Sequence, residues 1–237
     1  MSYPLPPNES KRLAALRHYQ IMDTGPEQAY DDFVYLASTI CRTPVALMSL
    51  VDAERQWFKA KVGLPVAETP REQAFCSYTI LQQEVMVVKD ATKDERFSTN
   101  PLVTSIPHIR FYAGAPLIDS EGMAMGSLCV IDRKPRTFTD EQAKSLKALA
   151  RQIMAHMEMR KISAELATAL GEIKTLNGLL PICSYCKEIR NDHGYWQSVE
   201  SYVSCHSEAR FTHGFCPSCI QERFPDVYEQ LKNEGEM

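Results

Sequence analysis

Two pairs of closely spaced cysteines near the end of the chain are the residues best suited to chemistry. Cys183 and Cys186 form the first C-x-x-C pair, Cys216 and Cys219 form the second, and 29 residues separate the pairs. Thiolates two residues apart in a tight turn can both face one ion, and four complete the tetrahedral shell that Zn²⁺ prefers. Because four thiolates leave no position for water, we expect a structural Zn²⁺ ion rather than a catalytic one.

A histidine beside the second pair offers an alternative to one of these thiolates. His213 lies three residues before Cys216, and structural zinc sites with three cysteines and one histidine are known. The same imidazole could instead hydrogen-bond to a ligand from outside the shell. A helix-forming run follows Cys219, and the positive end of a helix favours thiolates. Two cysteine turns, an insert between them and a closing helix resemble a treble-clef zinc finger.

The cysteines of the front part, Cys41, Cys76 and Cys129, stand singly among apolar residues. This setting is typical of a small buried side chain, and the wide spacing gives no suggestive cluster. We expect a cytoplasmic protein with free thiols, because the N-terminal residues lack the apolar core of a secretion signal. A membrane is not an expected partner, since no run reaches the roughly eighteen apolar residues that a span needs.

Charge is unevenly distributed, and it argues against nucleic acid as a partner. The chain carries a net charge of −4, and residues 178–237 hold five Lys or Arg against nine Asp or Glu. Binding to nucleic acid depends on clustered cations that neutralise phosphates. An acidic, cysteine-rich segment is a poor candidate for that role, so we expect no nucleic-acid partner.

The front of the chain alternates short apolar runs with polar turns. Two runs over 110–118 and 123–132 are joined by D-S-E-G, which is typical of a β-hairpin. Helices are expected within the first forty residues and over 71–83. Helices that flank antiparallel strands predict an α+β domain around one central sheet. The other expected strands cover 44–52, 56–63 and 85–90.

A long helix is expected after this domain. Thr139 and Gln142 form a capping box, and no strong break follows until Gly178 and Pro181. The second half of the segment carries an apolar seam with spacings of three and four residues. The seam predicts a parallel homodimeric coiled coil, and the alternative is an amphipathic helix that packs on its own chain. The seam consists of Ile162, Leu166, Ala169, Ile173, Leu176 and Leu180.

Five short motifs mark the front part of the chain. They are F-C-S-Y (75–78), V-K-D-A (88–91), D-E-R-F (94–97), R-F-Y-A-G-A-P-L (110–117) and G-S-L-C-V-I-D (126–132). Together they resemble a GAF domain, of the subfamily often found ahead of bacterial diguanylate cyclases and histidine kinases. The resemblance covers about residues 5–158. It implies a six-stranded antiparallel sheet flanked by helices, a sensory pocket on one face, and dimerisation through the terminal helices.

The end of the chain carries three further motifs. They are L-P-I-C-S-Y-C-K-E-I-R (180–190), G-Y-W (194–196) and H-G-F-C-P-S-C (213–219). They are similar to a cysteine-rich module at the C-termini of bacterial two-component and sensor proteins, which implies metal binding in a signalling context. We therefore expect a GAF-like sensor domain over 5–158, a coiled-coil linker helix over 159–180 and a zinc-binding module over 181–232.

Five polar residues of the sheet domain are candidates for contact with a ligand in the GAF-like pocket. Each has a structural alternative, since the tyrosines stand beside apolar residues and the arginine can brace a loop by pairing with an aspartate. A bilin is not expected, because no Cys-His attachment pair is present. The candidates are Cys76, Tyr78, Asp90, Arg110 and Tyr112.

The sequence contains no recognisable catalytic constellation, so we expect a protein without enzymatic activity. The expected function is a cytoplasmic signal-transduction sensor. An unidentified small molecule binds the GAF-like domain, and the dimeric helix and zinc module relay its presence to a protein partner. Two alternatives stay open. The clustered cysteines could act as a redox or zinc sensor, or the sheet domain could be a thiol enzyme similar to the GAF-type methionine-sulfoxide reductases.

Overall fold

The chain forms two compact units in this computed structural model. The structure describes residues 3–176, 180–191, 193–206 and 210–234. The first unit is Met1–Thr168 and the second is Ala169–Met237, so the division falls inside one long helix. Of the helices in these described residues, none is both long and apolar enough to cross a bilayer.

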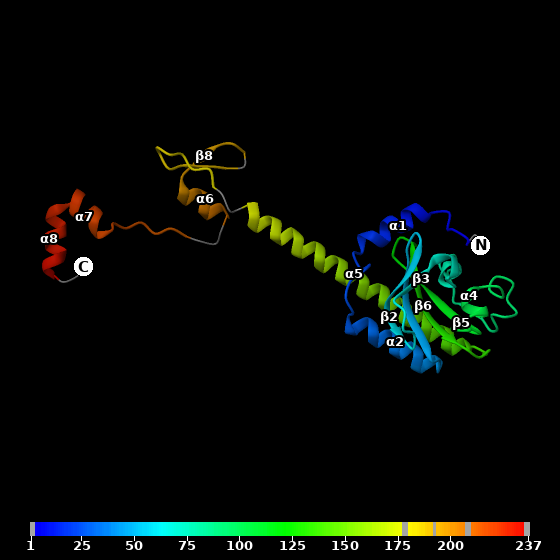
Figure 1. The fold of residues 1–237 in the computed structure, drawn as a ribbon. Helices are drawn as coiled ribbons and strands as arrows, with labels where there is room; N and C mark the ends of the chain where they lie inside the picture. The colour runs from blue at the N-terminus through cyan, green and yellow to red at the C-terminus, as the bar shows by residue number, and fades with distance from the viewer. Residues whose placement is uncertain (1–2, 177–179, 192, 207–209, 235–237) are drawn as a thin grey trace. The chain divides into compact units, whose positions relative to one another are not determined.

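Six antiparallel strands form the central sheet of the first unit (Figure 1). Their order is β3-β2-β1-β6-β5-β4, so β1 and β6 occupy the centre, and every residue of β1 is buried. This sheet confirms the antiparallel α+β architecture that the sequence predicts. The strands are β1 (Val45–Val51), β2 (Arg55–Val62), β3 (Glu68–Pro70), β4 (Met86–Val88), β5 (Phe111–Ile118) and β6 (Ala124–Asp132).

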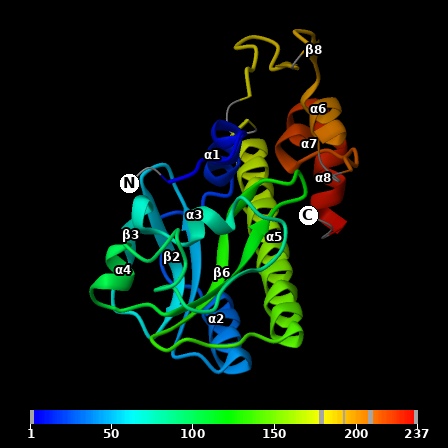
Figure 2. The same cartoon turned by 90° about the vertical axis from the view of Figure 1, so that its right-hand side faces the viewer.

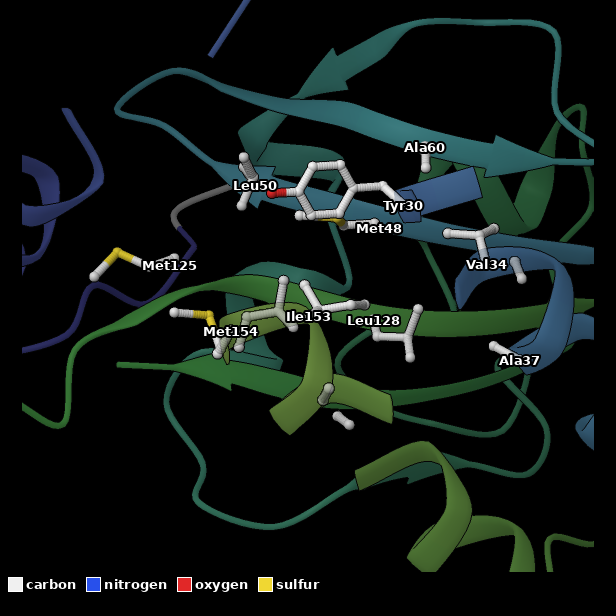
Figure 3. Close-up of a cluster of buried hydrophobic side chains, with 14 of the residues drawn as sticks. Tyr30, Val34, Ala37, Met48, Leu50, Ala60, Met125, Leu128, Ile153 and Met154 are labelled. Atoms are coloured by element: carbon white, nitrogen blue, oxygen red, sulfur yellow. The ribbon is translucent and has the colours of Figure 1, made fainter. Parts of the chain in front are cut away.

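One face of the sheet is covered by α2 (Gln28–Cys41) and α5 (Asp140–Leu176), with α1 (Glu9–His18) beside them (Figure 2). Successive strand residues point to opposite faces, so Met48 and Leu50 of β1 reach this core and Leu47 does not. The helices contribute apolar side chains at helical spacing, which pack against the strand residues. Figure 3 shows members of this core, including Tyr30, Val34, Met48, Leu128, Ile153 and Met154.

The opposite face is covered by η1 (Arg71–Gln73), α3 (Cys76–Thr79), α4 (Pro101–Thr104) and the loops around them. The sequence predicts one helix over 71–83, and the structure has two short helices instead. Ala74 lies between them in an extended conformation. The break directs Phe75 towards the sheet, where its ring stacks on Phe97 with the ring centres 3.9 Å apart.

A cluster of buried charge joins α1 to the sheet. Arg12 and Arg71 are each only 1% exposed, and both donate to the Glu9 carboxylate, over 2.7 Å and 2.5 Å respectively. Arg12 also donates to the Val51 carbonyl of β1, and Arg71 donates to the Asp52 carbonyl. Burial raises the pKa of Glu9, but the hydrogen bonds and charges of the two arginines outweigh it and hold that pKa at about 2.

The long helix expected after Thr139 is present as α5. Its start is the predicted capping box, in which the Thr139 N–H donates to Gln142 Oε1 over 3.1 Å. The Gln142 N–H donates in return to Thr139 Oγ1 over 3.2 Å. The first half of α5 packs on the sheet, where Leu146 and Ile153 are fully buried. This half therefore belongs to the core of the first unit.

The second half of α5 exposes an apolar stripe. In the predicted seam, the side chains of Ile173 and Leu176 lie outside the described part of the chain, and Leu180 lies beyond the end of α5. Pairing of the stripe with a second copy of the chain stays a prediction. The exposed apolar side chains of this stripe are Met159, Ile162, Leu166 and Leu170.

Beyond the end of α5, the described residues of the second unit form a small hairpin and three helices. Its strands pair antiparallel, with Ile189 opposite Gln197 and Arg190 opposite Trp196. The last helix begins at Pro225, which separates it from the preceding helix as its fixed φ and missing N–H require. The elements are β7 (Ile189–Arg190), β8 (Trp196–Gln197), α6 (Val199–His206), α7 (Pro217–Arg223) and α8 (Pro225–Glu234).

Candidate functional site

A cavity of about 280 Å³ lies in the first unit, between the sheet and the α3–α4 side. Its size is close to the lower limit of pockets that hold small-molecule ligands. Strand residues of β1, β2, β5 and β6 line it together with loop residues near α3 and α4. The wall is almost entirely apolar and includes Leu47, Phe58, Phe75, Leu102, Ile109 and Ile131.

One part of the cavity wall is a buried polar cluster around the Cys76 thiol. Ser49 of β1 and Ser127 of β6 face each other across the sheet, and both donate to Cys76 Sγ, over 3.1 Å and 3.0 Å. The Tyr112 hydroxyl lies 3.3 Å from the same sulfur. Cys129 of β6 follows Ser127 at strand spacing, so it shares this face, and its Sγ lies 4.0 Å from Cys76 Sγ. Cys76, Tyr112 and Cys129 all line the cavity.

These contacts shift the pKa values of the Cys76 and Cys129 thiols in opposite directions. Burial raises the pKa of Cys76, but hydrogen bonds from Cys129, Ser127, Ser49 and Tyr112 outweigh it and bring the pKa to about 7. The hydrogen bond to Cys76, together with burial, raises the pKa of Cys129 well above its usual value. Burial beside Cys76 likewise raises the pKa of Tyr112. Cys76 is thus the thiol that ionises first.

Two polar side chains whose oxygen atoms are buried line another part of the cavity. Gln56 of β2 and Thr69 of β3 are paired across the edge of the sheet. Among the described residues, neither Gln56 Oε1 nor Thr69 Oγ1 has a hydrogen-bond partner. A buried polar atom without a partner costs about 1–3 kcal/mol. A hydrogen-bond donor on a bound molecule would remove this cost.

The structure brings together only two of the five predicted ligand contacts. Cys76 and Tyr112 line the cavity. Tyr78 packs edge-on against Phe97, outside the cavity lining. Asp90 accepts from the Thr92 N–H and hydroxyl in a turn. Arg110 braces a loop, as its structural alternative proposes, but it donates to the carbonyls of residues 103 and 109 rather than to an aspartate.

The partners of Cys76 are not among the site residues predicted from the sequence. The sequence predicts Cys129 to be an isolated buried thiol, whereas the structure places it next to Cys76. Ser49 and Ser127 are not predicted site residues either, although both are polar residues within apolar strand runs. The strand period of two places Ser127 and Cys129 on one face, and that pattern was the available signal. The pairing of β1 with β6, which supplies Ser49, has no local signal.

The first cysteine pair of the second unit lies in a tight turn. The Lys187 N–H donates to the Cys183 carbonyl over 3.0 Å, and Lys187 has a φ of 64°. The backbone N–H groups of Cys186 and Tyr185 face the Cys183 sulfur and lower its pKa. Such a turn presents thiolates in the way that a zinc ion requires.

The second pair lies at the start of α7. Cys216 is the residue before the helix, and the backbone N–H of Cys219 lowers the pKa of Cys216. The donor chemistry of each pair therefore fits Zn²⁺. Within the described residues, however, no three or more His, Cys, Asp or Glu side chains lie close enough to hold one ion. A single site made of both pairs, with or without His213, stays a prediction.

Comparison with known proteins identifies the first unit. The family model for the GAF domain matches residues 25–157, which is more than half of the chain. The chain belongs to the GAF domain family. It is 43% identical over 155 residues to the cyclic di-GMP phosphodiesterase PA2567 of Pseudomonas aeruginosa. That match covers 65% of this chain and 26% of the relative, so the chain spans about a quarter of the relative's length.

Solved structures with a similar fold share less of the sequence. The GAF domain of an Acinetobacter phosphoenolpyruvate-protein phosphotransferase is 19% identical, with a TM-score of 0.48 over 65% of this chain and 98% of that one. The type II free methionine-R-sulfoxide reductase of Thermoplasma acidophilum is 15% identical, with a TM-score of 0.46 over 56% of this chain and 91% of that one.

One expectation from the sequence needs correction. The sequence contains no recognisable catalytic constellation and therefore predicts a protein without enzymatic activity. The relative with 43% identity is named a phosphodiesterase, so the expectation of a protein without enzymatic activity is wrong. A sequence without clustered catalytic motifs does not exclude enzymatic activity, because catalytic residues that are distant in the sequence can meet in the fold.

Proposed function

We propose that this chain is a signalling sensor whose GAF unit binds a small, largely apolar molecule in the cavity. The observation that carries the proposal is the chemistry of the cavity wall. An almost wholly apolar lining surrounds two buried oxygen atoms, on Gln56 and Thr69, that lack hydrogen-bond partners among the described residues. A ligand with an apolar body and a hydrogen-bond donor satisfies both features. Asp132 and exposed Arg133 also line the cavity, and because the Asp132 carboxylate is paired with Arg136, the Arg133 guanidinium favours an anionic group on the ligand.

We propose that α5 transmits the presence of a ligand in the cavity to the second unit. Its first half is part of the core, and its second half carries the exposed apolar stripe. We propose that two chains pair in parallel through this stripe as a coiled coil in the cytoplasm. A structural Zn²⁺ ion held by Cys183, Cys186, Cys216 and Cys219 would give the second unit a fixed surface for a protein partner.

An anionic fluorescent probe tests the cavity. 1-Anilinonaphthalene-8-sulfonate, an apolar molecule with one negative charge, should bind with increased fluorescence. Val66→Trp places an indole in the cavity lining and should weaken this binding about tenfold or more by excluding the probe. The measurement is a fluorescence titration of the full chain.

Leu36→Trp is the matched control for the probe titration. Leu36 is an exposed apolar residue of α2, which packs on the opposite face of the sheet. This variant should bind the probe as the wild type does. Equal affinity of Val66→Trp and the wild type would contradict a ligand site in the cavity.

A charged residue substituted into the apolar stripe of α5 tests whether the chain dimerises. Leu166→Glu should convert a dimer into a monomer in sedimentation equilibrium, because a buried carboxylate in a helix pair lacks a partner. Ala164→Glu is the control, since Ala164 lies about 200° around the helix from Ile162 and is exposed. A wild-type chain that is monomeric at all concentrations would contradict the dimer and favour a stripe covered by its own chain.

A second candidate function is turnover of cyclic di-GMP itself. The 43% identity to a protein named for this activity favours it. Incubation of the purified chain with cyclic di-GMP and Mg²⁺ or Mn²⁺, followed by chromatography, should then show the linear dinucleotide. Intact cyclic di-GMP after prolonged incubation would contradict this candidate, and saturable binding without turnover would support a sensor of the nucleotide.

A further inference from the structure

Two thiols that lie far apart in the sequence meet inside the first unit. Cys76 and Cys129 are 1% and 0% exposed to solvent, and their sulfur atoms are 4.0 Å apart. A disulfide requires an S–S distance of about 2.05 Å, so a side-chain movement of about 2 Å closes the gap. Both residues line the cavity, which gives a small solute access to buried thiols.

The surroundings of the two sulfurs are unequal. Two hydroxyl groups, those of Ser49 and Ser127, donate to Cys76 Sγ. Hydrogen bonds to a thiolate favour the ionised form, which is the nucleophile in thiol chemistry. Cys41 provides a contrast, because burial on the opposite face of the sheet raises its pKa to about 11 without any compensating hydrogen bond.

The geometry points to an oxidisable thiol pair, in which Cys76 reacts with hydrogen peroxide that enters the cavity and Cys129 completes a disulfide. This modification site is separate from the four cysteines that are proposed to bind zinc, and it does not depend on the identity of the cavity ligand. It uses the one pair of cysteines in the described part of the first unit whose sulfur atoms lie within 4 Å.

The chemistry proceeds in two balanced steps. The Cys76 thiolate attacks one peroxide oxygen, an S–O bond forms and the O–O bond breaks. The leaving hydroxide takes up the proton that Cys76 released and becomes water. Cys129 then attacks the sulfenic sulfur, an S–S bond forms and the S–O bond breaks. The second hydroxide takes the Cys129 proton, so two thiols are oxidised and one peroxide is reduced to two waters.

The disulfide would tie α3 to the central strand β6 and alter the part of the cavity wall that both sulfurs form. Ser49→Ala removes one of the donors to Cys76 Sγ without changing either thiol. The rate of oxidation should fall about tenfold, as expected for the loss of one hydrogen bond to the thiolate. This effect depends on the cluster and not merely on the presence of two cysteines.

Peptide mapping of the full chain tests the pair. After treatment with hydrogen peroxide, alkylation of the remaining thiols and trypsin digestion, peptide 72–89 should be joined to peptide 111–133. Each of these peptides contains one cysteine, Cys76 or Cys129. The joined mass should lie about 2 Da below the sum of the reduced peptides, because two hydrogens are lost. Cys41, in peptide 18–42, should remain alkylated as an internal control.

Two variants distinguish the oxidation of Cys76 by peroxide from the formation of the disulfide with Cys129. Cys129→Ser should stop the reaction at the sulfenic acid, which dimedone labels on peptide 72–89, and Cys76→Ser should give neither label nor cross-link. The cross-link should run as a single chain on a non-reducing gel. Alkylation of both cysteines after peroxide treatment in the wild type would overturn the proposal, as would a cross-link of either one to Cys41.

Discussion

Replacing Cys183 with serine should abolish binding of one Zn²⁺ ion per chain and unfold the second unit. The zinc ion that the four predicted thiolates coordinate is proposed to hold the turn at 183–186 against the start of α7. In small zinc modules the metal supplies about 10–16 kcal/mol of apparent binding free energy, which is also folding free energy. The first unit forms a separate compact body, so its unfolding transition should not change.

Native mass spectrometry should show one zinc ion on the wild-type chain and none on Cys183→Ser. Hydrogen exchange should rise across residues 183–219 in the variant and stay unchanged in the sheet. His213→Ala decides between the two proposed ligand sets. Retention of zinc supports four cysteines, and loss supports three cysteines with His213. A wild-type chain purified without any metal would contradict the module.

Replacing Glu9 with alanine should lower the free energy of unfolding by about 3–5 kcal/mol, the usual effect of leaving a buried charge unpaired. The variant leaves Arg12 and Arg71, both 1% exposed, without their shared carboxylate. Urea denaturation followed by circular dichroism measures the change. Glu68→Ala is the control, because Glu68 pairs with Arg55 at the surface and should cost about 1 kcal/mol or less.

The Glu9 effect should depend on pH in a defined direction. The folded-state pKa of about 2 lies below the ordinary value of 4.5, so the ionised carboxylate stabilises the fold. This stabilisation is complete above about pH 4.5 and is lost as the pH falls towards 2. The difference between wild type and Glu9→Gln should therefore shrink over that range. A difference that is constant from pH 7 to pH 2.5 would contradict the ion cluster.

Features that depend on neighbours in the chain were predictable. The capping box of α5 needs only Thr139 and Gln142, three residues apart. The β5–β6 hairpin depends on a turn in which Asp119 accepts from two nearby N–H groups and Gly122 has a φ of 81°. In both cases the residue types fix the conformation locally.

Features that depend on distant pairing were not predictable. The serines at 49 and 127 are 78 residues apart and meet only because β1 pairs with β6. The three-residue strand β3 was missed, since it is short and ends in Pro70. The helical pattern over 71–83 was broken by the packing of Phe75 on the sheet, which outweighs local propensity.

The sheet separates the cavity from the helical core by the thickness of one backbone. On β6, Leu128 packs with α5 and α2, and its neighbour Cys129 lines the cavity. On β5, Phe111 likewise packs in the helical core, and its neighbour Tyr112 lies on the cavity side of the sheet. A displacement of one of these strands from the cavity side therefore also displaces the surface on which α5 packs. Communication between the two layers needs no chain of intermediate side chains, because a single peptide plane belongs to both.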